Sequence, residues 1–230
     1  MKYAAKIAKK YGAKLVYISS AGVFDGKAHW YTEQHEPKPI NVYGFTKYCG
    51  ELLAQQYAPD ALVVRSGWMM GGGESRDKKF VAAIVKQIIE GAKEIYAVND
   101  KYGTPTYGYD FARNLEVLLA HNARGIYHMV CGGSASRYDM AKEIVKILGY
   151  EGSIMVTPVT SSYFKTIYSS PRPRYENLRN ARMDAEGLNR MQGWHHCLRQ
   201  YLEREFAYAK NPATQKLSLS LKFQIPSAKL

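Results

Sequence analysis

The segments LVYISSAGVFDG (15–26) and NVYGFTKYCGE (41–51), separated by a polar loop, decide the fold of this chain. The apolar residues that open the first segment are typical of a buried strand, which ends at Ser20. The second segment predicts a helix that begins near Tyr43, with Lys47 one turn later on the same face. A hydroxyl at a strand end, facing a tyrosine and a lysine one turn apart, is a proton-transfer arrangement. We take it as the candidate active site.

Helix and strand patterns alternate along most of the chain. Helices are predicted at about residues 1–11, 42–57, 77–91, 108–121, 137–148 and 195–209, with a helical stub at 162–168. Strands are predicted at about 14–19, 61–66, 94–98, 125–130 and 154–156. This alternation predicts an α/β fold with a largely parallel sheet. Residues 217–225 alternate apolar and polar, which fits an edge strand, a disordered tail or a partner-binding strand.

Composition limits the class of protein. The 230 residues are 46% hydrophobic and 23% charged, which is ordinary for a soluble globular protein. No run approaches the roughly 20 apolar residues that a membrane span needs, and the first residues lack the apolar core of a secretory signal. The three cysteines are scattered without a CxxC pair, which indicates a reducing compartment, so we expect a cytoplasmic protein. No metal-ligand spacing is present, and we expect no metal site.

The net charge of +12 raises the question of a nucleic-acid partner. The basic residues are dispersed along the chain, and no nucleic-acid-binding motif accompanies them, so we expect no nucleic acid. The same positive field suits an anionic small substrate such as a nucleotide sugar. Arg172 and Arg174, beside prolines, fit either a phosphate-binding loop or a solvated one.

The proposed chemistry follows from the pKa of tyrosine. Free tyrosine titrates near about 10, too high to exchange protons readily at neutral pH. The Lys47 ammonium would lower the pKa of Tyr43; a shift of about 3 units corresponds to roughly 4 kcal/mol. Tyr43 could then exchange a proton with a carbonyl or alcohol oxygen held by Ser20, which suits hydride transfer from a nicotinamide. A second YxxxK, at Tyr138 and Lys142, lacks a preceding strand-end hydroxyl and is interpreted as an ordinary helix start.

Two neighbouring residues have less specific interpretations. Glu51 is expected to be an i+4 partner of Lys47 or a solvated charge. Trp68, taken alone, is more typical of a core aromatic residue than of a ligand contact.

The sequence resembles the extended short-chain dehydrogenases/reductases, and within them the dTDP-4-dehydrorhamnose reductase family. The matching stretches keep the family's order and cover about residues 1–206: ISSAGVFDG (18–26), NVYGFTKYCGE (41–51), RSGWMMGGG (65–73), GTPTYGYDFARNLEVLL (103–119), GIYHMVCGG (125–133), SPRPRYENL (170–178) and GWHHCLRQYLERE (193–205). The resemblance implies that Ser20, Tyr43 and Lys47 are catalytic, and that Tyr43 and Lys47 also contact the nicotinamide cofactor. It further implies that Ser20, Trp68 and Arg172 bind the substrate.

The resemblance also implies an oxidoreductase of dTDP-rhamnose biosynthesis, which reduces the 4-keto group of a deoxysugar nucleotide with NADPH or NADH. The fold would be a partial Rossmann-like, doubly wound parallel sheet that lacks its first βαβ region. Residues 1–130 would be the remainder of the NAD(P)-binding domain, 131–208 mainly a substrate-binding lobe, and 209–230 a tail.

Two departures from the family bear on function. Ser20-Ala21-Gly22 stands where the family commonly has Thr-Asp-Tyr, and no glycine-rich cofactor turn precedes it. We therefore expect impaired cofactor binding by this chain. The alternative is a non-catalytic, reductase-like regulatory subunit. Homo-oligomer formation and binding to a partner enzyme both stay open.

Overall fold

Three parallel strands form the central sheet: β1 (Val16–Ser20), β2 (Leu62–Ser66) and β7 (Gly125–His128), in the order β1-β2-β7. The computed structural model describes residues 1–164 and 170–212; the strand pattern predicted at 217–225 lies outside them. The α/β fold with parallel strands is confirmed.

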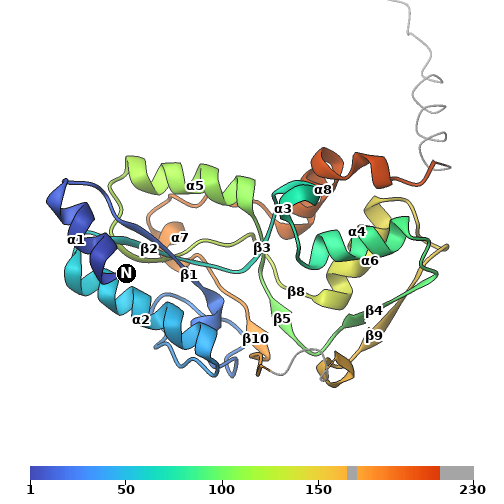
Figure 1. Cartoon of the computed structure of the whole chain (residues 1–230), viewed down its shortest axis with the longest axis horizontal. Helices are drawn as coiled ribbons and strands as arrows, with labels where there is room; N and C mark the ends of the chain where they lie inside the picture. Colours follow the sequence, from blue (N-terminus) through green and yellow to red (C-terminus); the bar gives the residue numbers. More distant parts are fainter. Residues whose placement is uncertain (165–169, 213–230) are drawn as a thin grey trace, which may run out of the picture.

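Helices cover both faces of this sheet (Figure 1). The helices α1 (Lys2–Lys10) and α2 (Val42–Tyr57) lie on one face, and α5 (Gly108–Ala120) lies on the other. Successive residues of β2 point to opposite faces, so Leu62 packs in the cluster with the buried side chains of α5 and Val63 packs with those of α2. Because both faces are covered, every residue of β2 is buried.

Strand β1 has a hydrogen-bonded neighbour on one side only among the described residues, namely β2. Its middle residue Ile18 is 37% exposed, whereas the residues of β2 are buried. Its last residue, Ser20, pairs with Ser66 of β2. Ser20 therefore lies at the carboxyl edge of the sheet, where ligands bind in open α/β folds.

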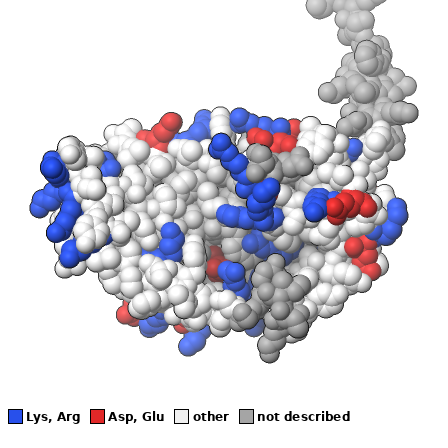
Figure 2. Space-filling model, viewed as in Figure 1, with Lys and Arg blue, Asp and Glu red and all other residues white. Residues whose placement is uncertain are grey.

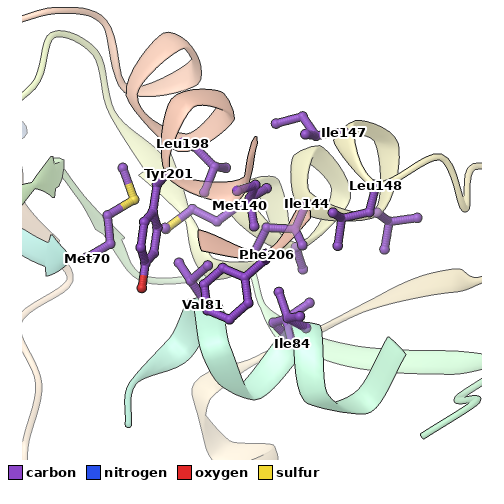
Figure 3. Packing of buried hydrophobic residues seen from close by; sticks show 14 of the residues in the cluster. Met70, Val81, Ile84, Met140, Ile144, Ile147, Leu148, Leu198, Tyr201 and Phe206 are labelled. Atoms are coloured by element: carbon purple, nitrogen blue, oxygen red, sulfur yellow. The ribbon is translucent and has the colours of Figure 1, made fainter. Parts of the chain in front are cut away.

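A second set of elements packs around its own core. Strand β4 (Glu94–Val98) pairs in parallel with β9 (Met155–Val159). The helices α4 (Phe80–Ile89), α6 (Arg137–Ile147) and α8 (Trp194–Glu205) supply most of the core. Figure 3 shows the buried side chains of this cluster, including Met70, Val81, Ile84, Met140, Ile144, Leu148, Leu198, Tyr201 and Phe206. The predicted division at residue 130 stays a prediction; β4 and α4 precede this residue and pack against β9 and α6, which follow it.

Short strands join these two parts of the molecule. Strand β3 (Trp68–Met70) pairs with β6 (Pro105–Tyr107), and β5 (Tyr102–Gly103) pairs with both β10 (Tyr175–Glu176) and β8 (Ala135–Ser136). The sequence did not predict them, because two or three residues are too few to show a strand period. The remaining short elements are η1 (Ala21–Val23), α3 (Gly73–Arg76), η2 (Ser161–Phe164), α7 (Ala181–Ala185) and η3 (Ala207–Ala209).

The helix predicted from residue 77 begins later, at Phe80. The cause is Asp77, whose carboxylate accepts a hydrogen bond from Lys79 N at 2.8 Å and another from the Tyr201 hydroxyl at 2.8 Å. A side chain that bonds the main chain locally in this way favours a turn over a helix. In contrast, α6 begins where predicted, because Ser136 and Asp139 form a capping box.

Candidate active site

Ser20 forms a tight turn at the end of β1. Its main chain is extended, and its Oγ accepts a hydrogen bond from Gly22 N at 3.1 Å, which caps the short helix η1. Its hydroxyl hydrogen has no acceptor among the described residues and can donate to a ligand. The serine side chain is thus held in place and still able to bind a carbonyl oxygen.

Tyr43 lies in the first turn of α2, close to this serine. Asn41 caps the helix, with its Oδ1 accepting from Gly44 N at 2.8 Å. A methyl group added to Gly22 would lie 3.4 Å from ring carbons of Tyr43 and 3.5 Å from Ser20 Oγ. The tyrosine ring and the serine hydroxyl therefore both adjoin Gly22. The Tyr43 side chain is 53% exposed, so a ligand can reach it.

Lys47 lies against β1. Its Nζ donates a hydrogen bond to the carbonyl oxygen of Ile18 at 2.6 Å and lies 5.0 Å from the ring centre of Tyr17. Burial lowers the pKa of Lys47, and the charge of Glu51 opposes this shift. The structure thus brings Ser20, Tyr43 and Lys47 to one corner of the sheet.

Trp68 and Arg172 reach the neighbourhood of this corner from other elements. Trp68 begins β3, two residues after Ser66, which pairs with Ser20. Its indole Nε1 donates to Glu176 Oε2 at 2.9 Å. Arg172 lies exposed before β10, and its carbonyl oxygen accepts from Lys101 Nζ at 2.9 Å. On the face of the molecule drawn in Figure 2, Lys and Arg side chains occur at many places, with Asp and Glu side chains between them.

The interpretation of Glu51 as a partner of Lys47 or a solvated charge is wrong. Glu51 is 1% exposed and forms a two-pronged ion pair with Arg65 of β2, at 2.9 Å (Nε to Oε1) and 2.7 Å (Nη2 to Oε2). The helix turns Glu51 toward the buried strand, where Arg65 is also 1% exposed. This pair fastens the helix that holds Tyr43 and Lys47 to the centre of the sheet.

His128 extends this buried network. Its Nδ1 donates to Arg179 O at 3.1 Å, since a carbonyl can only accept, and its Nε2 faces Arg65 Nη1 at 3.4 Å. Burial, followed by the charge of Arg65, lowers the pKa of His128 to about 3. The imidazole is therefore neutral in the folded protein at neutral pH.

The low pKa of His128 predicts a loss of stability in mild acid. The unfolded chain takes up a proton near about pH 6.5 and the folded chain only near its lowered pKa, so stability falls as pH drops between these values. We expect the free energy of unfolding to be about 2 kcal/mol lower at pH 5 than at pH 7 through this group. In His128→Asn, whose amide can still donate to Arg179 O, the loss should shrink. Urea unfolding of both proteins at pH 7 and pH 5 measures this loss. An equal loss of unfolding free energy in His128→Asn and in the wild-type chain would contradict the assignment of the pH dependence to His128.

A cluster of Asp110, Cys131 and Cys197 was not foreseen from the sequence, because its members lie on separate elements. Their ligand-type atoms lie within 4.8 Å of one another, and all three residues are buried. The Cys197 thiol donates to Asp110 Oδ2 at 3.7 Å, and Gln192 N donates to the same oxygen at 2.9 Å. The adjacent Cys131 thiol and burial raise the pKa of Cys197, which keeps it protonated. The cluster is thus a hydrogen-bonded part of the buried core. That the chain has no metal site stays a prediction.

Within the described residues, no helix is long and apolar enough to cross a membrane.

Comparison with known proteins identifies relatives over nearly the whole described chain. Residues 1–206 match the family model of the RmlD substrate binding domain. The spore coat polysaccharide biosynthesis protein SpsK of Bacillus subtilis is 33% identical over 87% of this chain and 68% of that protein. A crystal structure of a dTDP-4-dehydrorhamnose reductase from Clostridium acetobutylicum matches with a TM-score of 0.81 and 32% identity, over 88% of this chain and 69% of the other.

A dTDP-4-dehydrorhamnose reductase from Bacillus anthracis, solved in complex with NADP, matches with a TM-score of 0.79 and 31% identity, over 87% of this chain and 69% of the other. The chain therefore spans about two thirds of the length of the relatives it matches.

Proposed function

The chain belongs to the RmlD substrate binding domain family, the family of the dTDP-4-dehydrorhamnose reductases, and from this premise we propose that its chemistry is the NADPH-dependent reduction of the 4-keto group of a deoxysugar nucleotide. The observation that supports this most directly is that Ser20 Oγ and the Tyr43 ring both lie within 3.5 Å of the position that a methyl group on Gly22 would occupy. This pair lies at the carboxyl end of a parallel strand, where an α/β fold binds its ligand.

In the proposed reaction, each residue has a separate task. The Ser20 hydroxyl donates a hydrogen bond to the substrate carbonyl oxygen and fixes its position. Tyr43 gives its phenolic proton to that oxygen as the alcohol forms, while the Lys47 ammonium favours the phenolate that remains. NADPH, when bound, supplies the hydride to the carbonyl carbon. Tyr43 and Lys47 would also contact its nicotinamide end.

We also propose roles for the two substrate residues. The Trp68 ring would lie beside the sugar, because aromatic rings offer an apolar face to a sugar ring and a polar edge to hold them in place. Arg172, exposed on its loop, would face the diphosphate, since a guanidinium can bind two phosphate oxygens at once.

We propose that the described residues contact only the nicotinamide end of the cofactor, through Tyr43 and Lys47. The Gly71–Gly73 loop is the glycine-rich turn in the described chain with consecutive positive φ values, and it is the natural candidate to hold the diphosphate. A methyl group on Gly73 would lie 2.6 Å from Glu205 Oε2, so a carboxylate lies directly against this loop. A carboxylate there repels a phosphate. We therefore propose that the chain binds cofactor weakly.

Ligand titration tests this function. We expect a dTDP-sugar to bind the 230-residue chain, while NADPH shows no saturation in the micromolar range. Isothermal titration calorimetry with dTDP-glucose, a stable analogue with an uncharged sugar, and with NADPH measures both affinities, and ADP serves as a non-cognate control nucleotide. Micromolar binding of NADPH would overturn the proposed weakness toward cofactor. Equal binding of ADP and dTDP-glucose, or binding of neither, would overturn the proposed substrate class.

A further inference from the structure

Trp68 lies close to the proposed reaction centre. Ser66 pairs with Ser20 across the sheet, and Trp68 follows Ser66 by two residues. Neighbouring strands lie about 4.8 Å apart and rise about 3.3 Å per residue, so the main chains of Trp68 and Ser20 lie within about 12 Å. A sugar held near Ser20 is therefore within reach of side chains that surround the indole.

The indole of Trp68 is fixed on three sides. Its Nε1 donates to Glu176 Oε2 at 2.9 Å, and the guanidinium of Arg137 lies 3.9 Å from the ring centre. Gly103 packs directly against the ring, so closely that a side chain at this position would collide with the indole. Since a glycine, a cation and a carboxylate all hold it, the ring has little freedom to turn.

Glu176 belongs to the segment of residues 171–176. This segment runs from the start of α2, the helix that carries Tyr43 and Lys47, to Trp68. At one end, Asn41 Nδ2 donates to Pro171 O at 2.9 Å; Asn41 caps the helix that begins beside Tyr43. At the other end, β10 pairs with β5, with Glu176 opposite Gly103. This segment therefore connects the N-terminal cap of α2 to the carboxylate that contacts Trp68.

Glu176 has three positively charged side chains nearby, yet its carboxylate forms no close ion pair among the described residues. Its side chain is partly buried, and burial raises its pKa; the Trp68 indole and the nearby charges of Arg172, Arg137 and Lys101 oppose that shift. One oxygen accepts from Trp68, and the other accepts no hydrogen bond from the described residues. That second oxygen is available to a ligand.

We propose that Glu176 selects the sugar: its fixed carboxylate accepts a hydrogen bond from a hydroxyl group of a neutral sugar and repels a sugar that carries a carboxylate of its own. This inference rests on the proposed function, since it assigns the sugar class to the same site. Three cations surround Glu176 and would by themselves attract an acidic sugar. The single negative charge among them reverses that preference at the position of the sugar.

Glu176→Gln separates this role from a structural one. The glutamine amide oxygen can still accept from the Trp68 indole, so the ring stays in place while the charge is lost. Calorimetric titration with UDP-glucose and UDP-glucuronate compares a neutral and an acidic sugar on the same nucleotide. We expect the wild-type chain to bind the neutral compound at least about tenfold more tightly, a difference of about 1.4 kcal/mol. In Glu176→Gln the ratio should fall below about threefold, chiefly because the acidic compound binds better.

Glu143→Gln is the matched control. Glu143 lies on α6, where its carboxylate is 18% exposed and 3.8 Å from Arg199, so its loss removes the same charge elsewhere. In Glu143→Gln, the ratio of the affinities for UDP-glucose and UDP-glucuronate should equal that of the wild-type chain. An unchanged ratio in Glu176→Gln, or an equal change in Glu143→Gln, would overturn the proposal. If neither UDP-sugar nor dTDP-glucose binds, the proposed function fails, and the selectivity inference fails with it.

Discussion

Replacement of Glu51 by alanine is expected to lower the free energy of unfolding by about 3–5 kcal/mol. The reason is that Arg65, 1% exposed, would keep its charge in the centre of the sheet without a counter-charge. Two other side chains lie beside the guanidinium: the Phe24 ring carries no charge, and His128 is held neutral, so neither can replace the carboxylate. Urea unfolding at neutral pH measures the loss.

The exposed pair Lys86–Glu90 is the control for this prediction. Its side chains are 74% and 61% exposed, and the pair joins the last turn of α4 to the residue that ends the helix. Glu90→Ala should therefore cost no more than about 0.5 kcal/mol. A loss in Glu51→Ala as small as this would show that Arg65 finds water or another partner. The double variant Glu51→Leu, Arg65→Met should recover much of the stability, because a buried pair can be replaced by apolar side chains.

Gly44→Ala is expected to damage the active site and destabilise the protein together. A methyl group on Gly44 would collide with the carbonyl oxygen of Gly22 and approach Pro39 Cβ to 3.0 Å. The helix would have to move away from the Ser20 turn, which would separate Tyr43 from Ser20. We expect a stability loss of about 1–3 kcal/mol and, with NADPH in the millimolar range, a reduction rate on the order of 10²-fold lower.

Gly108→Ala is the matched control, because Gly108 also lies in the first turn of a helix. A methyl group there would meet Met70 O at 3.5 Å, an ordinary contact. Alanine is preferred to glycine in a helix, so this variant should be as stable as the wild-type chain or slightly more so. Equal behaviour of the two variants, measured by urea unfolding and by NADPH oxidation, would show that the Gly22–Gly44 contact does not set the position of the helix.

Much of the central sheet was predictable because its signals are local. The strand that ends at Ser20 and the helix that carries Tyr43 each show their own periodicity and punctuation, and both stand where the sequence predicts them. The second YxxxK, at Tyr138, opens an ordinary capped helix, again as predicted. In these cases the residues that determine the structure are neighbours along the chain.

The rest depends on contacts that sequence spacing does not reveal. Glu51 follows Lys47 by one turn, so a local rule paired them, yet the partner of Glu51 is on β2. Glu176 carried almost no signal in the sequence, because its importance comes from its contact with Trp68, which depends on a pairing of two-residue strands. An acidic residue that follows an Arg-Pro segment is only a weak hint of such a contact.

The hydrogen bond between Trp68 and Glu176 has a consequence for the order of folding. It joins residues 108 apart in the sequence, whereas the Glu51–Arg65 pair joins residues 14 apart. Closing a longer loop costs more chain entropy, so contacts between distant residues tend to form later. We therefore expect the unit of residues 16–66 to fold first and the contacts of the 171–176 segment to form afterwards. A partly folded chain would then hold Tyr43 beside Ser20 before it holds Trp68 in place.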